Sequence, residues 1–228
     1  MVTKVDWRPA YRIIDSRYPF VGLFDRVARA ADLEGVLAFE ALTNERVLDE
    51  VGDLRLVRAA DRVSGPGTTP IMAAFTHTHP SRFSDGSFGV WYAARRRTTA
   101  IAEVRHHKTI FLQATHEPSI DLDLRVYAAD VRGHFEDLRG RAADDPLYDP
   151  LAYGPAQAFA RERYTENAVD GIVYRSVRDP SRNAACIAAF RPRAVTNCVT
   201  AAYLTFRWDG RAIVEVHERA EIMRFAED

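Results

Sequence analysis

The sequence predicts an α+β fold, with a mixed or antiparallel sheet at the core and helices flanking it. Helical periodicity comes early in the chain, strand-like segments come late, and one helix lies between strands in the middle. This order differs from the regular β–α alternation of a doubly wound nucleotide-binding fold. The chain also lacks both glycine-rich phosphate loops, G-x-G-x-x-G and G-x-x-x-x-G-K-[ST].

The composition is that of an ordinary globular protein of 228 residues, and we expect one domain over residues 1–228. The net charge of -1 gives no bulk attraction to nucleic acid or to an anionic membrane, so we expect neither as a partner. No apolar run approaches the ~20 residues of a membrane span. The two cysteines, Cys186 and Cys198, form no metal or disulfide pattern, which favours a reducing compartment, the cytoplasm.

The first third of the chain is expected to be mainly helical. Residues 11–14 are a short strand candidate, and apolar residues recur at helical spacing over 21–51. Residues 54–62 fit either a short strand or a short helix. A Gly- and Pro-rich loop over 64–70 leads to a short apolar run over 71–75, which is interpreted as a strand.

The rest of the chain alternates less regularly between strands and helices. Residues 88–93 are expected to be a strand, followed by a helix over 98–108 with Thr98 as its N-cap. Strict alternation of apolar and polar residues over 120–128 predicts a half-buried strand. The remaining predicted elements are a short helix over 134–141, a helix over 156–168, strands over 171–176 and 184–190, and a hairpin of 203–208 with 212–217 about a two-residue Asp209-Gly210 turn.

Two residues between positions 80 and 107 stand out as candidates for chemistry. Arg82 lies in a loop of Ser, Asp and Gly, where a guanidinium can bind a phosphate or carboxylate through two hydrogen bonds. The alternative is a surface arginine paired with Asp85. Glu103 is a lone acid among Ala, Ile and Val on the predicted helix, and no capping box explains it. The alternative is a structural ion pair with an arginine.

Tyr92 and Ser176 are weaker candidates by themselves. Tyr92 lies on the strand that leads into the helix of Glu103, where an aromatic ring can stack on a planar ligand or donate its O–H; the alternative is ordinary sheet core. Ser176 ends a predicted strand outside any G-x-S-x-G elbow, so an acyl-transfer nucleophile is not expected, and a turn residue is the alternative.

The histidines allow a second hypothesis, a metal-dependent hydrolase that uses His77, His79 and His106. Imidazoles can bind zinc, but the chain has no H-E-x-x-H motif and no cysteine near these histidines. The expectation is therefore that the protein holds no metal. A third hypothesis is a binding module without catalytic activity.

Three blocks of the sequence resemble the RES domain, which is named for its Arg, Glu and Ser. They are R-F-S-D-G-S-F-G-V-W-Y-A-A over 82–94, T-T-A-I-A-E-V-R-H-H over 98–107 and G-I-V-Y-R-S-V-R over 171–178. The resemblance assigns the family residues to Arg82, Tyr92, Glu103 and Ser176. It also places Arg12, on the opening strand, at the pocket. Arg175 is a departure, because many members have Pro at that position.

The resemblance implies a fold like that of ADP-ribosyltransferases, with a helical region at about 21–62 and a catalytic core at about 70–217. It implies the toxin of a type II toxin–antitoxin system, neutralised by a helix-turn-helix (Xre-like) antitoxin. Such a toxin cleaves NAD+, its substrate, at the nicotinamide–ribose bond and passes ADP-ribose to water, phosphate or a protein. Arg82, Glu103 and Ser176 would be catalytic, and Arg82, Tyr92, Arg12 and Ser176 would bind NAD+.

Overall fold

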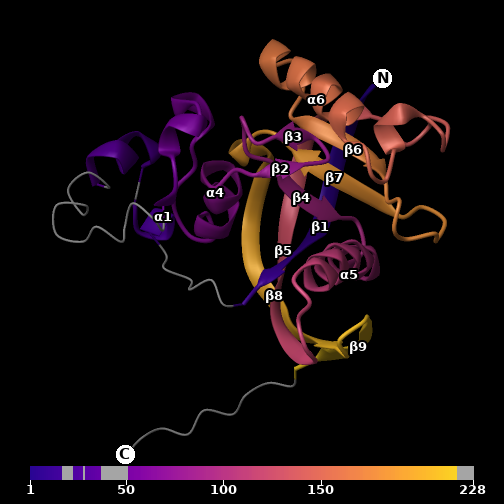
Figure 1. Cartoon of the computed structure of the whole chain (residues 1–228). Coiled ribbons are helices and arrows are strands. Elements are labelled where there is room, and N and C mark those ends of the chain that lie inside the picture. The colour runs from indigo at the N-terminus through magenta and orange to yellow at the C-terminus, as the bar shows by residue number, and fades with distance from the viewer. Residues whose placement is uncertain (17–22, 28, 37–50, 220–228) are drawn as a thin grey trace, which may run out of the picture.

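The computed structural model describes residues 1–16, 23–27, 29–36 and 51–219 (Figure 1). The α-helices in this part of the chain include α1 (Leu23–Arg26), α4 (Thr69–Thr76), α5 (Arg97–Ala114) and α6 (Gly154–Glu166), and residues 33–36 are helical as well. The strands are β1 (Val2–Asp15), β2 (Pro80–Ser81), β3 (Ser84–Asp85), β4 (Trp91–Ala94), β5 (Ile120–Asp137), β6 (Gly171–Arg175), β7 (Ala185–Ala189), β8 (Val195–Trp208) and β9 (Ile213–Glu218). No helix among the described residues is both long and apolar enough to cross a membrane.

Seven strands form one sheet in the order β1-β4-β7-β6-β5-β8-β9, and β1 also pairs with β5. Because β1 pairs with both β4 and β5, the pairings of strands β1, β4, β7, β6 and β5 form a closed ring. Strands β5 and β6 run parallel, whereas the other pairs in this sheet are antiparallel. The prediction of an α+β fold with a mixed sheet is confirmed.

The longest strand corrects one prediction. Alternation predicted a strand over 120–128, but β5 continues to Asp137, so the helix expected over 134–141 is wrong. His134 is paired with Lys4 of β1, and Phe135 with both Thr3 of β1 and Gly171 of β6. Partners on both edges hold this segment extended, and such tertiary pairing overrides local preference.

A second correction concerns the apolar run at 71–75, which is helical and belongs to α4. Pro70 lies in the first turn, a position that suits its fixed φ and missing N–H. The helix is buried at Ile71, Met72 and Phe75. A short helix buried on several sides has no polar face, so its apolar run cannot be distinguished from a buried strand by pattern alone.

Smaller differences occur at element ends. The helix of Glu103 begins one residue early, with Arg96 rather than Thr98 as N-cap. The β8–β9 connection has four residues rather than two, because Trp208 pairs with Ile213. Residues 54–62 form two 3-10 turns, η2 (Leu54–Leu56) and η3 (Ala59–Asp61). Of the predicted helical region at 21–51, residues 21–22, 28 and 37–50 lie outside the described part.

Two apolar clusters lie on the two faces of the sheet. One joins α4 and the N-terminal segment around Phe24 to β-strand residues such as Trp91. The other joins α5 and α6 to the opposite face, through residues such as Leu112 and Ala160. Figure 1 shows α1 and α4 on one side of the strands and α5 on the other. The second cluster borders the cavity described next.

Candidate active site

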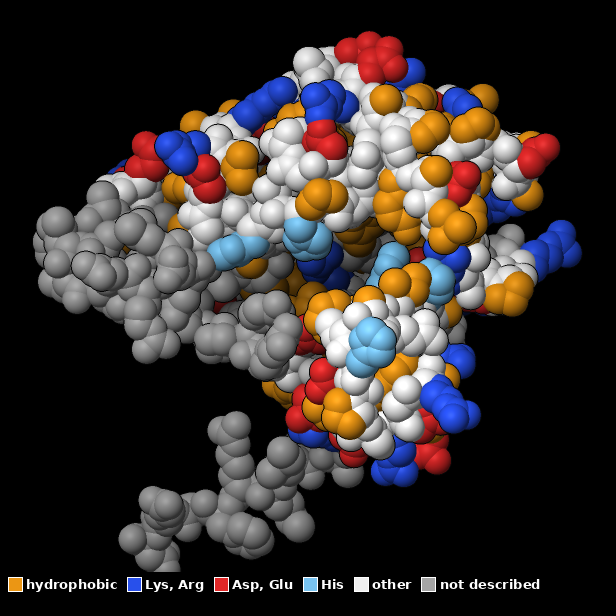
Figure 2. Space-filling view, in the orientation of Figure 1, with side chains coloured by type: hydrophobic (Ala, Val, Ile, Leu, Met, Phe, Trp, Pro, Cys, Tyr) orange, Lys and Arg blue, Asp and Glu red, His pale blue; other side chains and the backbone are white. Residues whose placement is uncertain are grey.

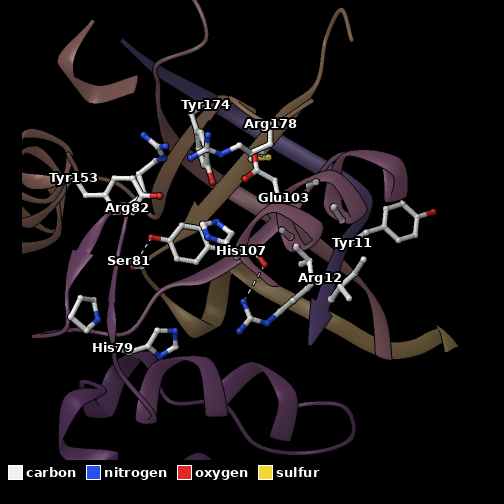
Figure 3. Close-up of a pocket in the computed structure, with 18 residues that line it drawn as sticks. Tyr11, Arg12, His79, Ser81, Arg82, Glu103, His107, Tyr153, Tyr174 and Arg178 are labelled. Atoms are coloured by element: carbon white, nitrogen blue, oxygen red, sulfur yellow. Dashed lines mark hydrogen bonds between the residues drawn. The ribbon is translucent and has the colours of Figure 1, made fainter. Parts of the chain in front are cut away.

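A cavity of about 440 Å³ opens between β1, β4, α5 and the β2–β3 hairpin. This volume lies within the range of roughly 300–1,000 Å³ that small-molecule sites occupy. Figure 2 shows the hollow, with histidine side chains near its rim and a basic side chain inside. The described polar residues that line the cavity are Tyr11, Arg12, His79, Ser81, Arg82, Tyr92, Glu103, His107, Tyr153, Tyr174 and Arg178 (Figure 3).

Arg82 lies at the tip of the β2–β3 hairpin, and only 9% of the residue is exposed. Its Nη1 donates to the carbonyl oxygens of Leu147 (3.3 Å) and Asp149 (2.9 Å), and its guanidinium carbon lies 4.7 Å from the ring centre of Tyr153. The alternative of a surface pair with Asp85 is wrong, because the Asp85 carboxylate pairs with Arg161. Arg82 thus presents a buried guanidinium at the cavity wall.

Tyr92 has a structural hydroxyl and a ring that faces the cavity. The hydroxyl lies 2.9 Å from the Ser81 hydroxyl and accepts a hydrogen bond from the Phe83 N–H at 2.9 Å. Burial raises the pKa of Tyr92 to about 12. Since both neighbours of Arg82 are bound to this one phenol, Tyr92 fixes the hairpin tip that carries the guanidinium.

Glu103 projects from α5 into the cavity, and Ser176 holds its carboxylate. The Ser176 hydroxyl donates to Glu103 Oε1 at 2.5 Å and accepts from the backbone N–H groups of Arg178 (3.1 Å) and Asp179 (2.9 Å). The Asp179 carboxylate in turn accepts from the Thr99 hydroxyl at 2.6 Å, which joins this turn to the start of α5. Ser176 itself does not line the cavity. It is placed to orient Glu103.

The ion pair proposed as an alternative for Glu103 is not observed. Within the described residues, no lysine, arginine or histidine nitrogen lies within 4.0 Å of its carboxylate oxygens. The thiol of Cys186, at 3.8 Å from Oε1, is its other polar neighbour. The carboxylate is therefore oriented by hydrogen bonding while its charge is left uncompensated at close range.

The cavity has an excess of positive charge. Arg12 donates from Nη1 to the Tyr92 carbonyl oxygen at 3.2 Å, and Arg178 donates from Nη2 to the Pro150 carbonyl oxygen at 2.9 Å. Burial lowers the pKa of Arg12. With Arg82, three guanidiniums line the cavity, against Glu103 as the one acidic residue among the described lining residues. Such a site is complementary to an anionic ligand.

The structure gathers Arg12, Arg82, Tyr92 and Glu103 at one cavity, with Ser176 immediately behind Glu103. The residues that the sequence analysis missed are Tyr11, His107, Tyr153, Tyr174 and Arg178, whereas His79 was considered only as a metal ligand. Two of them, Tyr174 and Arg178, lie inside the block over 171–178 and could have been found there. Nothing in the local sequence marks Tyr153, which reaches the cavity from a loop far along the chain.

Among the residues that the structure describes, the histidines are not grouped as metal ligands. No group of three or more His, Cys, Asp or Glu residues is arranged to hold a metal ion in the part of the chain that the structure describes. His79 lines the cavity, but His77 and His106 do not. Burial, together with the charge of Arg178, lowers the pKa of His106. The hydrolase hypothesis therefore has no ligand set among these residues.

The family model for the RES domain matches residues 55–209, about two thirds of the chain. The chain belongs to the RES domain family. The matched region of this RES domain contains Arg82, Tyr92, Glu103 and Ser176, whereas Arg12 precedes it. The structure also accounts for Arg175, where many members have Pro: its backbone N–H donates to the Tyr148 hydroxyl at 3.0 Å, which proline cannot do.

Two further similarities concern individual proteins. The RES domain is 28% identical over 206 residues to "Uncharacterized protein y4oC" of Sinorhizobium fredii (strain NBRC 101917 / NGR234), covering 89% of this chain and 84% of that protein. It is also similar to a chain in the crystal structure of the M. tuberculosis MbcT-MbcA toxin–antitoxin complex, with a TM-score of 0.46 and 12% identity over 87% of this chain and 86% of that one. At this identity and TM-score the likeness carries no argument about function.

Proposed function

We propose that this RES domain is the toxin of a toxin–antitoxin system and that it cleaves NAD+ at the nicotinamide–ribose bond. One observation carries the proposal: a single carboxylate, Glu103, is oriented by Ser176 on the wall of a cavity that three guanidiniums otherwise make cationic. Membership in the RES family supplies the reaction class, and the geometry supplies a role for each group.

The bond to be broken joins ribose C1″ to the cationic nicotinamide nitrogen. Its electron pair leaves with the nitrogen, so nicotinamide departs neutral and the positive charge moves to the ribose. A fixed carboxylate stabilises such an oxocarbenium-like state, as acids do in glycoside cleavage. Glu103 takes this role, and Ser176 acts through Glu103 by holding its oxygen in place. No general acid is required.

The other groups bind the substrate in this proposal. Arginine guanidiniums at the cavity would hold the diphosphate through charge-assisted hydrogen bonds, and the ring of Tyr92 would orient the nicotinamide. The ADP-ribose passes to water, to phosphate or to a protein. When water is the acceptor, its oxygen bonds to C1″ and one proton is released, giving ADP-ribose, nicotinamide and H+.

The proposed partner is a helix-turn-helix (Xre-like) antitoxin that covers the cavity. A toxin that consumes NAD+ must be neutralised in the cell that makes it. We place the protein in the cytoplasm, which fits two free, buried cysteines, Cys186 and Cys198.

The reaction can be tested on the purified protein by adding NAD+ with and without phosphate and analysing the products by mass. Free ADP-ribose, ADP-ribose-1″-phosphate and a mass-shifted protein identify water, phosphate and protein as acceptors. We expect Glu103→Gln to slow nicotinamide release by about 100-fold or more, since removal of one electrostatic stabiliser typically has this effect. Glu162→Gln makes the same exchange at an exposed side chain on α6 and should change nothing.

Two results would reject the proposal. Equal nicotinamide release by wild type and Glu103→Gln would remove the carboxylate from the mechanism. Binding of NAD+ by the wild type without release of nicotinamide would favour the hypothesis of a binding module.

A further inference from the structure

Residues 145–153, here called the clamp loop, lie behind one wall of the cavity and contribute Tyr153 to its lining. The Asp145 carboxylate accepts from the Leu147 N–H, and the Asp149 carboxylate accepts from the N–H groups of Leu151 and Ala152, each bond being 2.8–2.9 Å long. The Tyr148 hydroxyl donates to the Leu138 carbonyl oxygen at 2.9 Å. These bonds fix the backbone of the loop, so its carbonyl groups have defined directions.

The clamp loop holds two arginines that come from distant parts of the chain. Its carbonyl groups at Leu147 and Asp149 accept from Arg82, and the carbonyl group at Pro150 accepts from Arg178. Figure 3 shows the Arg82 and Arg178 side chains on the same side of the cavity, beside Tyr174 and Glu103. One segment of backbone therefore brings two guanidiniums to one wall.

Neither guanidinium is neutralised. Among the described residues, no carboxylate oxygen lies within 4.0 Å of a side-chain nitrogen of Arg82 or Arg178, although this chain forms many such pairs elsewhere. Neutral carbonyl oxygens orient the two side chains without cancelling their charge. Two like charges on one wall of a site repel each other, and an anion that binds between them offsets this repulsion.

We infer that Arg178 is a substrate-binding residue that acts together with Arg82 on one diphosphate group. This inference rests on the proposed function and extends it to a residue for which the sequence analysis gave no role. A diphosphate carries two negative charges on separate phosphoryl groups, which matches two guanidiniums with several free N–H donors. Binding at this wall brings the attached ribose next to Glu103, which lies on the same side of the cavity.

The test is calorimetric binding of two ligand pairs to the full-length protein. ADP and ADP-ribose contain the diphosphate, whereas adenosine and nicotinamide do not. We expect Arg178→Gln to weaken binding of ADP and ADP-ribose by about 10- to 100-fold, because charge-assisted hydrogen bonds are lost, and to leave adenosine and nicotinamide unchanged. Arg182→Gln, at an exposed arginine four residues along, is the matched control and should bind all four ligands as wild type does.

A cycle with Arg82→Gln tests the pairing itself. If both guanidiniums bind the same group, the double variant should lose less ADP-ribose affinity than the product of the two single losses. Arg178→Lys keeps the charge without the guanidinium fork and should give an intermediate loss. It also serves if Arg178→Gln fails to fold.

The inference is overturned if both Arg178 variants bind ADP-ribose as tightly as wild type. It is likewise overturned if their affinity for adenosine falls by the same factor as their affinity for ADP-ribose. It is also overturned if the two arginines contribute independently. A different result would reject the proposed reaction, namely a wild type that binds ADP-ribose but releases no nicotinamide from NAD+.

Discussion

Arg191 and Arg82 are the two most buried arginines in the described part of the chain, with 1% and 9% of their surfaces exposed. Arg191 is surrounded by compensating groups: its Nη1 lies 3.7 Å from the Asp61 carboxylate, its Nη2 donates to the Tyr164 carbonyl oxygen at 2.7 Å, and its guanidinium lies 4.4 Å from the Tyr164 ring centre. The open space beside it is about 10 Å³, too little for a ligand.

Arg82 has neutral partners of the same kind, two carbonyl oxygens and the Tyr153 ring, but no carboxylate within 4.0 Å among the described residues. Carbonyl oxygens rather than a carboxylate fix it, a second guanidinium lies on the same wall, and the adjoining cavity has about 440 Å³. The comparison teaches that burial alone does not distinguish a structural arginine from a binding one. The charge of the partner and the empty volume nearby distinguish the two kinds of arginine. An arginine paired with a carboxylate in a filled space stabilises the fold, whereas an unpaired arginine beside a cavity can bind an anionic ligand.

The largest effect on stability is therefore expected at Arg191. Asp61→Asn removes the carboxylate that faces a fully buried guanidinium, and loss of one partner of a buried pair should lower the free energy of unfolding by about 3 kcal/mol. Urea unfolding monitored by fluorescence measures the change. Nicotinamide release by the folded fraction should stay at the wild-type rate.

Asp6→Asn is the control, because Asp6 pairs with Arg8 at the surface and its loss should leave the free energy of unfolding close to that of the wild type. If Asp61→Asn instead unfolds like wild type, Arg191 does not depend on its carboxylate and the contrast with Arg82 loses its basis.

A smaller effect, and one confined to catalysis, is expected at Ser176. Ser176→Ala removes the hydroxyl that donates to Glu103 Oε1, so the carboxylate becomes less well oriented. We expect kcat for nicotinamide release to fall about tenfold, in line with the ~1–1.5 kcal/mol of one hydrogen bond, while KM changes little. Ser176→Thr, which keeps the hydroxyl, should restore most of the rate. A rise in KM at constant kcat would show that Ser176 contacts the substrate directly.

The sequence predicted the principal residues of the site better than it predicted the groups that hold those residues in place. Arg82, Tyr92 and Glu103 lie in one stretch, and a strand followed by a helix necessarily brings residues of such a stretch near one another. Arg178 was missed although it is two residues from Ser176, because its role depends on the Pro150 carbonyl group. A backbone carbonyl group has no residue type, so no sequence pattern reveals which loop will offer one.

The fold shows the same division between local and distant causes. Alternation over 120–128 is a local property and predicted β5 correctly, whereas the extension to Asp137 depends on β1 and β6, which come from opposite parts of the chain. The apolar run of α4 resembles a strand in sequence because the helix is buried against both the sheet and the N-terminal region. Local periodicity cannot report contacts made by distant segments.

The smallest effect is expected at Tyr92, whose hydroxyl is structural although its ring lines the cavity. Its pKa is raised to about 12, above the value of about 10 for an exposed tyrosine, so its proton is held more tightly in the folded state. The stabilisation is complete below pH 10 and is lost as the pH rises from about 10 to 12, because the unfolded chain ionises first. Tyr92→Phe should lose less stability than wild type in this window.

Urea unfolding at pH 7, 9, 10 and 11 measures that difference. At pH 7 the variant should be less stable by about 1 kcal/mol, since the Phe83 N–H and the Ser81 hydroxyl lose their common partner. If the free energy of unfolding falls equally for wild type and Tyr92→Phe above pH 10, Tyr92 ionises as freely in the folded protein as in the unfolded one. The hydroxyl would then be accessible to a ligand and, like the ring, would belong among the groups that bind substrate rather than among those that hold the site together.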